Sequence, residues 1–111
     1  MEVDPTSAVK QVLAAWRSLP EVKDFAFARQ GFGNSDGGFG IIYPHELDSY
    51  DREVDGADIS EGYVQVYGFW GPPNGYQLEV LESTYLQILA RELLKAGHSQ
   101  AAEEVQAFIT R

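Results

Sequence analysis

Hydrophobic residues near the N-terminus recur with the period of an amphipathic helix. The apolar positions on one face of that helix are Val9, Val12, Leu13 and Trp16. Asp4 can cap the first turn, and Pro5 suits the first helical position, where its missing N–H removes no hydrogen bond. We expect the helix to end at Leu19 and Pro20, because the residue before a proline avoids the helical conformation.

The middle of the chain alternates large apolar residues with small or polar ones, which is the period of a β-strand. The expected strands are residues 24–29, 39–43, 63–69 and 76–81. The glycine-rich residues 31–38 predict a hairpin between the first two strands. Asn74 and Gly75, which follow two prolines, predict a turn between the last two.

The expected strand at 63–69 has two different faces. Alternation places Tyr63, Tyr67 and Phe69 on one face and Val64, Val66 and Leu81 on the opposite one. We expect most of the aromatic residues around this hairpin to pack in the core under the C-terminal helices. Trp70 has two interpretations: a buried plug of the core, or an exposed anchor for a partner at a rigid turn.

The last third of the chain is predicted to be helical. Ser83 or Thr84 can cap a helix whose apolar stripe is Leu86, Ile88, Leu89, Leu93 and Leu94. Gly97 is expected to end that helix in the left-handed conformation. A second helix is expected over residues 99–109. Its inner face carries Ala102, Val105 and Ile109.

This order of elements predicts an α+β fold for one domain that spans residues 1–111. We expect a four-stranded, mostly antiparallel sheet, with the N-terminal helix and the C-terminal helix pair packed on it. The residues expected to be largely buried are Val12, Trp16, Phe25, Phe27, Val64, Val66, Leu86, Leu89 and Leu93.

Composition narrows the classes of function. The hydrophobic fraction of 44% and charged fraction of 23% are ordinary for a soluble domain, and no stretch approaches the ~18 apolar residues of a membrane span. Because no signal peptide is recognisable, we expect a cytoplasmic protein that does not act at a membrane. The chain has no cysteine and two histidines, so we expect no metal site and no cofactor.

Negative charge is concentrated in one segment. The chain carries a net charge of -9, and residues 44–61 hold seven carboxylates against Arg52 alone. Such an acidic chain is not expected to bind nucleic acid, whose phosphates are bound by Lys and Arg. The segment is expected to be a long loop between two strands, and loops beyond ~12–15 residues are usually functional or mobile.

Three interpretations of this acidic segment are open. The segment is interpreted as a solvated loop whose charge keeps the chain soluble, as a docking surface for a basic partner, or as a calcium-binding loop. Residues 51–56 match the opening of a calcium loop, but Gly62 stands where a bidentate Glu is required. For the docking interpretation, the expected contact residues are Glu46, Asp48, Tyr50, Asp51, Glu53, Asp55, Asp58 and Trp70.

One catalytic motif is matched in the sequence, but the elements predicted around it do not fit that motif. Residues 33–37 match the G-x-S-x-G nucleophile elbow, which requires a strand before it and a helix after it. Here a second strand is expected after it, so the stretch is predicted to be a hairpin turn. We therefore expect no catalytic residues, and a small enzyme is kept as an alternative.

Residues 62–81, followed by Tyr85, Leu86 and a helix pair, resemble small immunity proteins of bacterial polymorphic-toxin and contact-dependent inhibition systems. The resemblance implies a compact, acidic, cytoplasmic α+β domain that binds a cognate toxin and blocks its active site. A basic toxin cleft would suit the acidic segment, with a tyrosine such as Tyr50 filling a pocket. The alternative binding function is an acidic secretion chaperone, for which a homodimer is possible.

Overall fold

The strands of this protein form a single antiparallel sheet. The computed structural model describes residues 4–16, 18–34, 38–47, 59–68 and 76–109. The elements are α1 (Pro5–Ala15), α2 (Leu19–Phe27), β1 (Phe32–Asn34), β2 (Phe39–Ile42), the 3-10 helix η1 (Pro44–Glu46), β3 (Tyr63–Gly68), β4 (Tyr76–Leu81), α4 (Glu82–Lys95) and α5 (Ser99–Ile109). The strand order is β1-β2-β3-β4 with every neighbour antiparallel, which confirms the predicted α+β fold.

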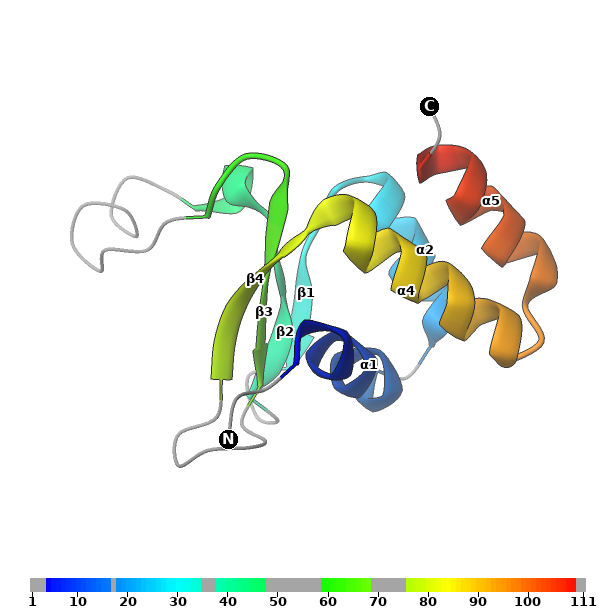
Figure 1. The fold of residues 1–111 in the computed structure, drawn as a ribbon, viewed down its shortest axis with the longest axis horizontal. Helices are drawn as coiled ribbons and strands as arrows, with labels where there is room; N and C mark the ends of the chain where they lie inside the picture. Colours follow the sequence, from blue (N-terminus) through cyan, green and yellow to red (C-terminus); the bar gives the residue numbers. More distant parts are fainter. Residues whose placement is uncertain (1–3, 17, 35–37, 48–58, 69–75, 110–111) are drawn as a thin grey trace.

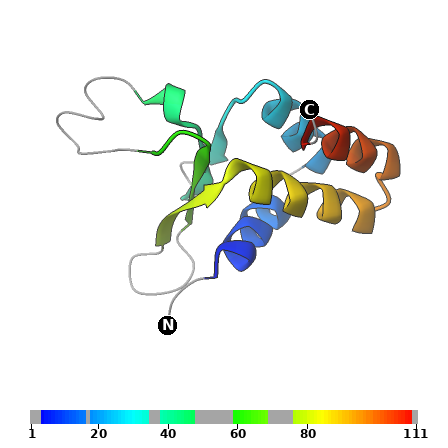
Figure 2. The same cartoon turned by 45° about the horizontal axis from the view of Figure 1, so that its top comes forward.

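The described α-helices all lie on one side of the sheet (Figure 1). Helix α1 packs against β2, β3 and β4, and α4 continues from β4 beside α1. Helices α2 and α5 then pack on α4, as the second view also shows (Figure 2). The main core therefore lies between the inner face of the sheet and the helices, and α4 is its central element.

Helix α1 begins as predicted and ends earlier than predicted. The Asp4 carboxylate accepts a hydrogen bond from the Ser7 N–H at 3.3 Å, and Pro5 is the first helical residue. The helix ends at Ala15, and Trp16 is already extended. The predicted end at residues 19–20 was wrong, because these residues belong to the next helix.

The strand predicted at residues 24–29 was also wrong, because most of this segment belongs to α2. The Ser18 hydroxyl caps α2 by accepting from the Glu21 N–H at 3.4 Å, and a proline in the first turn is compatible with a helix. The strand that pairs with β2 is instead β1, with Phe32 opposite Ile41.

Six of the nine residues expected in the core are buried, and three are not. Phe25 and Phe27 lie two positions apart on a helix, so they point in different directions. Phe25 is half-buried and stacks on Phe32 at 5.6 Å, whereas Phe27 stacks on Phe108 at 4.9 Å and is 36% exposed. Trp16 is also half-buried. The buried six are Val12, Val64, Val66, Leu86, Leu89 and Leu93.

The two faces of β3 differ as predicted, but the tyrosines are not on the core face. Val64 and Val66 are fully buried, whereas Tyr63 and Tyr67 are half-buried on the face away from the helices. Leu81 pairs with Tyr63 and is 47% exposed, so its predicted place beside the valines was wrong. Directly paired residues of an antiparallel ladder share a face. Phe69 and Trp70 lie outside the described residues.

Tyr67 lies across two glycines on the face away from the helices. Gly40 pairs with both Gly33 and Tyr67, so the three residues form one row across β1, β2 and β3. A Cβ atom would lie 2.5 Å from the Tyr67 hydroxyl oxygen if added to Gly33, and 2.6 Å from it if added to Gly40. The absence of side chains at these two positions therefore makes the space that the Tyr67 ring fills.

The C-terminal helix pair agrees with prediction except at two points. Helix α4 starts at Glu82 with Leu81 at its N-cap, so the predicted cap by Ser83 or Thr84 was wrong. Leu94, expected in the apolar stripe, is 61% exposed. Gly97 ends α4 with φ of 89° as predicted, and α5 has the predicted bounds. No helix in the described part of the chain is long and apolar enough to cross a membrane.

Candidate functional site

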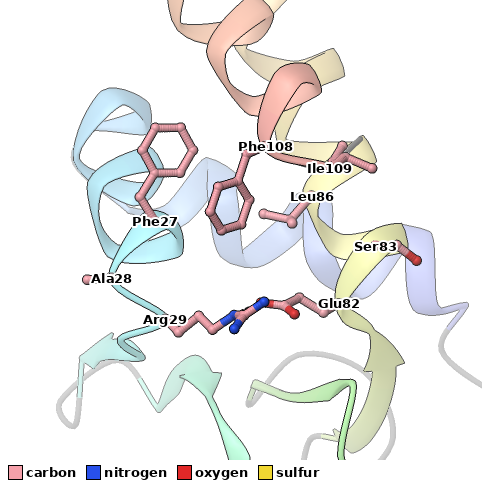
Figure 3. Close-up of a pocket in the computed structure, with 8 residues that line it drawn as sticks. All are labelled: Phe27, Ala28, Arg29, Glu82, Ser83, Leu86, Phe108 and Ile109. Atoms are coloured by element: carbon pink, nitrogen blue, oxygen red, sulfur yellow. The ribbon is translucent and has the colours of Figure 1, made fainter. Parts of the chain in front are cut away.

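Two pockets meet at one ion pair, which joins the end of α2 to the start of α4. The Arg29 Nε donates to the Glu82 carboxylate at 3.2 Å, and both residues line both pockets. The first, here called the apolar pocket, has a volume of about 430 Å³ (Figure 3). Its lining residues are Phe27, Ala28, Arg29, Glu82, Ser83, Leu86, Phe108 and Ile109. The ion pair forms the polar wall of this otherwise mostly apolar pocket.

The second, here called the polar pocket, has a volume of about 240 Å³. Its lining residues are Arg29, Tyr43, Pro44, His45, Glu61, Gly62, Tyr63 and Glu82. The chain leaves β2 through Pro44 and His45 and enters β3 through Glu61 and Gly62. The polar pocket therefore lies where the two ends of the acidic segment 44–61 join the sheet.

Arg29 has the only positive φ among the described non-glycine residues, 51°. It ends α2 in the left-handed conformation: its own N–H donates to the Ala26 carbonyl, and the Gln30 N–H donates to the Phe25 carbonyl. Gly97 has the same role after α4, where no side chain is strained. The conformation costs a residue with a Cβ roughly 1–2 kcal/mol, and it fixes the Arg29 side chain between the two pockets.

Tyr43, which lines the polar pocket, has an unusual buried hydroxyl group. The Tyr43 residue is 3% exposed, and its hydroxyl oxygen has no hydrogen-bond partner among the described residues. Burial raises the pKa of this hydroxyl, the negative charges of Glu82 and Glu46 raise it further, and Arg29 opposes them. The hydroxyl is therefore neutral at physiological pH and has unused hydrogen-bonding capacity beside an ion pair.

Alkaline pH is expected to destabilise the fold through the buried tyrosines. Burial also raises the pKa of Tyr85 well above 10. In the unfolded chain tyrosine loses its proton near pH 10, so above that pH the native state binds more protons than the unfolded state. The free energy of unfolding is thus constant just below pH 10 and falls above it. Urea titrations across this pH range measure the fall, and Tyr85→Phe is expected to reduce its slope. An unchanged slope in that variant would contradict the assignment.

Glu46 is the one predicted contact residue that the structure describes, and its carboxylate is already engaged. It accepts hydrogen bonds from the Gly31 N–H at 3.0 and 3.1 Å and from the Tyr43 N–H at 2.8 Å. These bonds tie η1 to the end of β2 and to the residue before β1. Glu46 thereby anchors one end of the acidic segment, and its contact with a partner remains a prediction.

Replacing Glu46 with alanine is expected to lower stability by roughly 1–3 kcal/mol, because hydrogen bonds to a charged acceptor are lost and two backbone donors are left unpaired. Glu46→Gln should cost less, because the amide oxygen keeps one acceptor. Thermal unfolding measures both, with the exposed Glu103 changed to alanine as the control. If the loss in Glu46→Ala does not exceed that of the control, the anchoring role is wrong.

The other predicted contact residues lie outside the described residues: Asp48, Tyr50, Asp51, Glu53, Asp55, Asp58 and Trp70. The calcium-like residues 51–56 lie there too. Within the ranges that the structure describes, no three His, Asp or Glu side chains are grouped so that they could hold a metal ion. The G-x-S-x-G stretch joins β1 to β2, so a strand follows it as predicted.

Sequence reasoning missed Arg29, Tyr43 and Glu82 as site residues. Arg29 and Glu82 are separated by 53 positions, and their pairing depends on α2, which was predicted as a strand. The capping pattern from Ser18 to Glu21 was the signal available for α2, since Ser followed by Glu three residues later marks a helix start. Searches for similar proteins add no further assignment: no protein-family model, curated protein or solved structure matches this chain.

Proposed function

We propose that this chain is a non-enzymatic protein-binding domain whose partner presents a basic surface. The observation that carries the proposal is the charge of residues 44–61. This segment holds seven carboxylates and one arginine, so it supplies most of the chain's net charge of -9. Concentrated like charge destabilises a fold through self-repulsion, and it speeds encounter with a surface of opposite charge. The segment therefore has a physical use in binding that offsets its cost.

The anchoring of the segment supports this proposal. Glu46 fixes one end to the sheet, as described above. At the other end the Ser60 N–H donates to the Glu79 carboxylate at 2.8 Å, and Ile59 is only 3% exposed. The two described ends of the segment are thus held at the same end of the sheet, where β2 finishes and β3 begins.

The polar pocket suits binding better than proton transfer. A general acid or base works best when its pKa is near the pH of the reaction. Burial raises the pKa of the Tyr43 hydroxyl far above physiological pH. Glu82 is held in an ion pair with Arg29. A tyrosine hydroxyl that stays protonated and a carboxylate held in an ion pair are suited to hydrogen bonding with a partner rather than to catalysis.

The partner that we propose is a bacterial toxin whose basic active site the acidic segment occludes, following the resemblance to immunity proteins. The alternative is a secretion chaperone, which would use a continuous apolar patch on the open sheet face. In the described part of that face, Tyr63, Tyr67 and Leu81 are interleaved with Gln65 and Glu79. This mixed surface gives the chaperone less support than the toxin.

Association kinetics test the proposal. The partner is first captured from a lysate of the source organism and identified, and its binding is then followed by stopped-flow fluorescence. The test variant neutralises Asp48, Asp51, Asp55 and Asp58 with asparagine. The control variant removes equal charge elsewhere, at Glu2, Asp24, Glu103 and Glu104, with the matching amides.

The test variant is expected to associate roughly 10-fold or more slowly than the control at low salt, with its thermal stability unchanged or slightly raised. The difference should shrink as ionic strength approaches about 0.1 M, where the Debye length is about 10 Å. Equal association rates for the two variants at low salt would contradict the proposal, because the acidic segment would then only aid solubility.

A further inference from the structure

We propose that the polar pocket holds an arginine side chain of the basic partner. This inference rests on the proposed function, because it names the chemical group that the partner inserts at the base of the acidic segment. The pocket volume of about 240 Å³ is below the ~300–1,000 Å³ of typical small-molecule sites, so it suits one side chain rather than a whole ligand.

The acceptors for such a group come from three elements. Glu61 lies before β3 and is exposed, and Glu82 begins α4. One oxygen of Glu82 accepts from Arg29, and a carboxylate has a second oxygen that can accept from another donor. Tyr43, at the end of β2, contributes a buried hydroxyl oxygen without a partner. A guanidinium has five N–H donors in one plane, which can serve several acceptors at once.

The unpartnered Tyr43 hydroxyl is the observation that points to a ligand. Buried polar groups are nearly always hydrogen-bonded, and one that is not destabilises the fold by roughly 1–3 kcal/mol. This oxygen has almost no accessible surface, so a donor that enters the polar pocket beside Glu82 would satisfy it through a small movement of the Tyr43 side chain. The hydroxyl proton would remain free to bond a carboxylate.

The charges around the pocket favour a cation over an anion. Glu61 and Glu82 line it together with one cation, Arg29, and the charge of Glu46 also acts on the Tyr43 hydroxyl. An anion would have to approach these carboxylates. The half-buried ring of Tyr63 lines the same pocket, and an aromatic face also attracts a guanidinium.

The test uses the protein alone with three small probes and does not need the partner. The probes are N-acetyl-arginine amide, its neutral isostere N-acetyl-citrulline amide, and acetate as an anion. Heteronuclear NMR follows the backbone amides of Gly62, Tyr63 and Glu82. We expect saturable shifts with the arginine probe at a dissociation constant on the order of millimolar, and at least about tenfold weaker binding of the citrulline probe.

Four variants identify the atoms that bind. Tyr43→Phe and Glu61→Gln are each expected to weaken binding of the arginine probe about threefold to tenfold, because each removes one acceptor. Arg29→Gln removes the competing cation, so binding should be unchanged or tighter. Glu103→Gln, an exposed carboxylate on α5, is the matched control and should leave binding unchanged. Unchanged NMR spectra away from the pocket establish that each variant is folded.

Several results would overturn the inference. These are an absence of shifts at the pocket with the arginine probe, equal binding of the citrulline probe, or equal weakening by the Glu103→Gln control. Acetate binding that Arg29→Gln abolishes would instead identify an anion site. If the probe fails to bind while the acidic-segment variant still associates slowly with the partner, the pocket assignment is wrong and the proposed function stands.

Discussion

Replacing Leu89 with alanine is expected to destabilise the fold by about 2–5 kcal/mol. Leu89 is fully buried on α4, the helix that contacts α1, α2, α5 and two strands of the sheet. Removing its side chain forfeits apolar burial and leaves a cavity that well-packed neighbours fill only in part. Urea unfolding followed by circular dichroism measures the loss as a lower midpoint with an unchanged slope.

Leu94 provides the matched control on the same helix. It is 61% exposed, so Leu94→Ala is expected to change the free energy of unfolding by no more than about 0.5 kcal/mol. Both substitutions remove the same atoms from a helix, and alanine favours a helix at least as well as leucine. Similar losses in the two variants would contradict the assignment of α4 as the centre of the core.

Replacing Gly40 with alanine is expected to destabilise the protein by roughly 1–3 kcal/mol. The added Cβ would meet the Phe32 carbonyl oxygen, and it would lie 2.6 Å from the Tyr67 hydroxyl and 2.8 Å from the Gly33 Cα. Tyr67 can move aside, but the Phe32 carbonyl and the Gly33 Cα are backbone atoms of the paired strand. Thermal unfolding measures the loss.

The sign of the change in stability distinguishes a crowded Gly40 from one with room for a side chain. A strand glycine that could accept a Cβ without strain would gain about 0.4–1 kcal/mol on becoming alanine, because the unfolded chain loses conformational freedom. The double variant with Tyr67→Ala separates the side-chain part of the clash from the backbone part. Part of the loss should persist in that background. A stabilised Gly40→Ala variant would show that β1 and β2 are not as close as described.

The fold was predictable where one local signal decided the structure. Gly97 ends α4 as expected. The N–H groups of Gly97 and His98 donate to carbonyls of the last helical turn, which requires a left-handed conformation at Gly97 that glycine adopts without strain. The alternation in β3 placed Val64 and Val66 in the core. Three of the four strands, β2, β3 and β4, and the C-terminal helix pair followed from such signals.

The errors occurred where two local signals competed. Phe25 and Phe27 alternate with alanines, which fits a strand, yet Val22 and Ala26 are the residues that α2 buries, at helical spacing. The two phenylalanines contact different parts of the molecule, and only the tertiary structure provides both partners. The face of Leu81 likewise depended on the pairing of β3 with β4, which no single strand encodes.

The candidate site was predictable in its charge but not in its geometry. The acidity of residues 44–61 is visible in the chain itself. The polar pocket, in contrast, combines the end of α2, the end of β2 and the start of α4, and its buried hydroxyl belongs to a residue that looks like an ordinary strand tyrosine. Neither the burial of Tyr43 nor the contact between Arg29 and Glu82 has a signal in the sequence.

Carboxylate labelling of the complex tests most directly whether the acidic segment and the polar pocket face the partner. The free chain and its complex with the captured partner are each treated with a carbodiimide and an amine, and mass spectrometry gives the modification of each carboxylate. We expect the complex to protect Glu61 and the aspartates of segment 44–61, and to leave Glu103 and Glu104 of α5 as reactive as before. Protection of the α5 carboxylates, with the acidic segment labelled as in the free chain, would contradict both the docking surface and the function proposed for it.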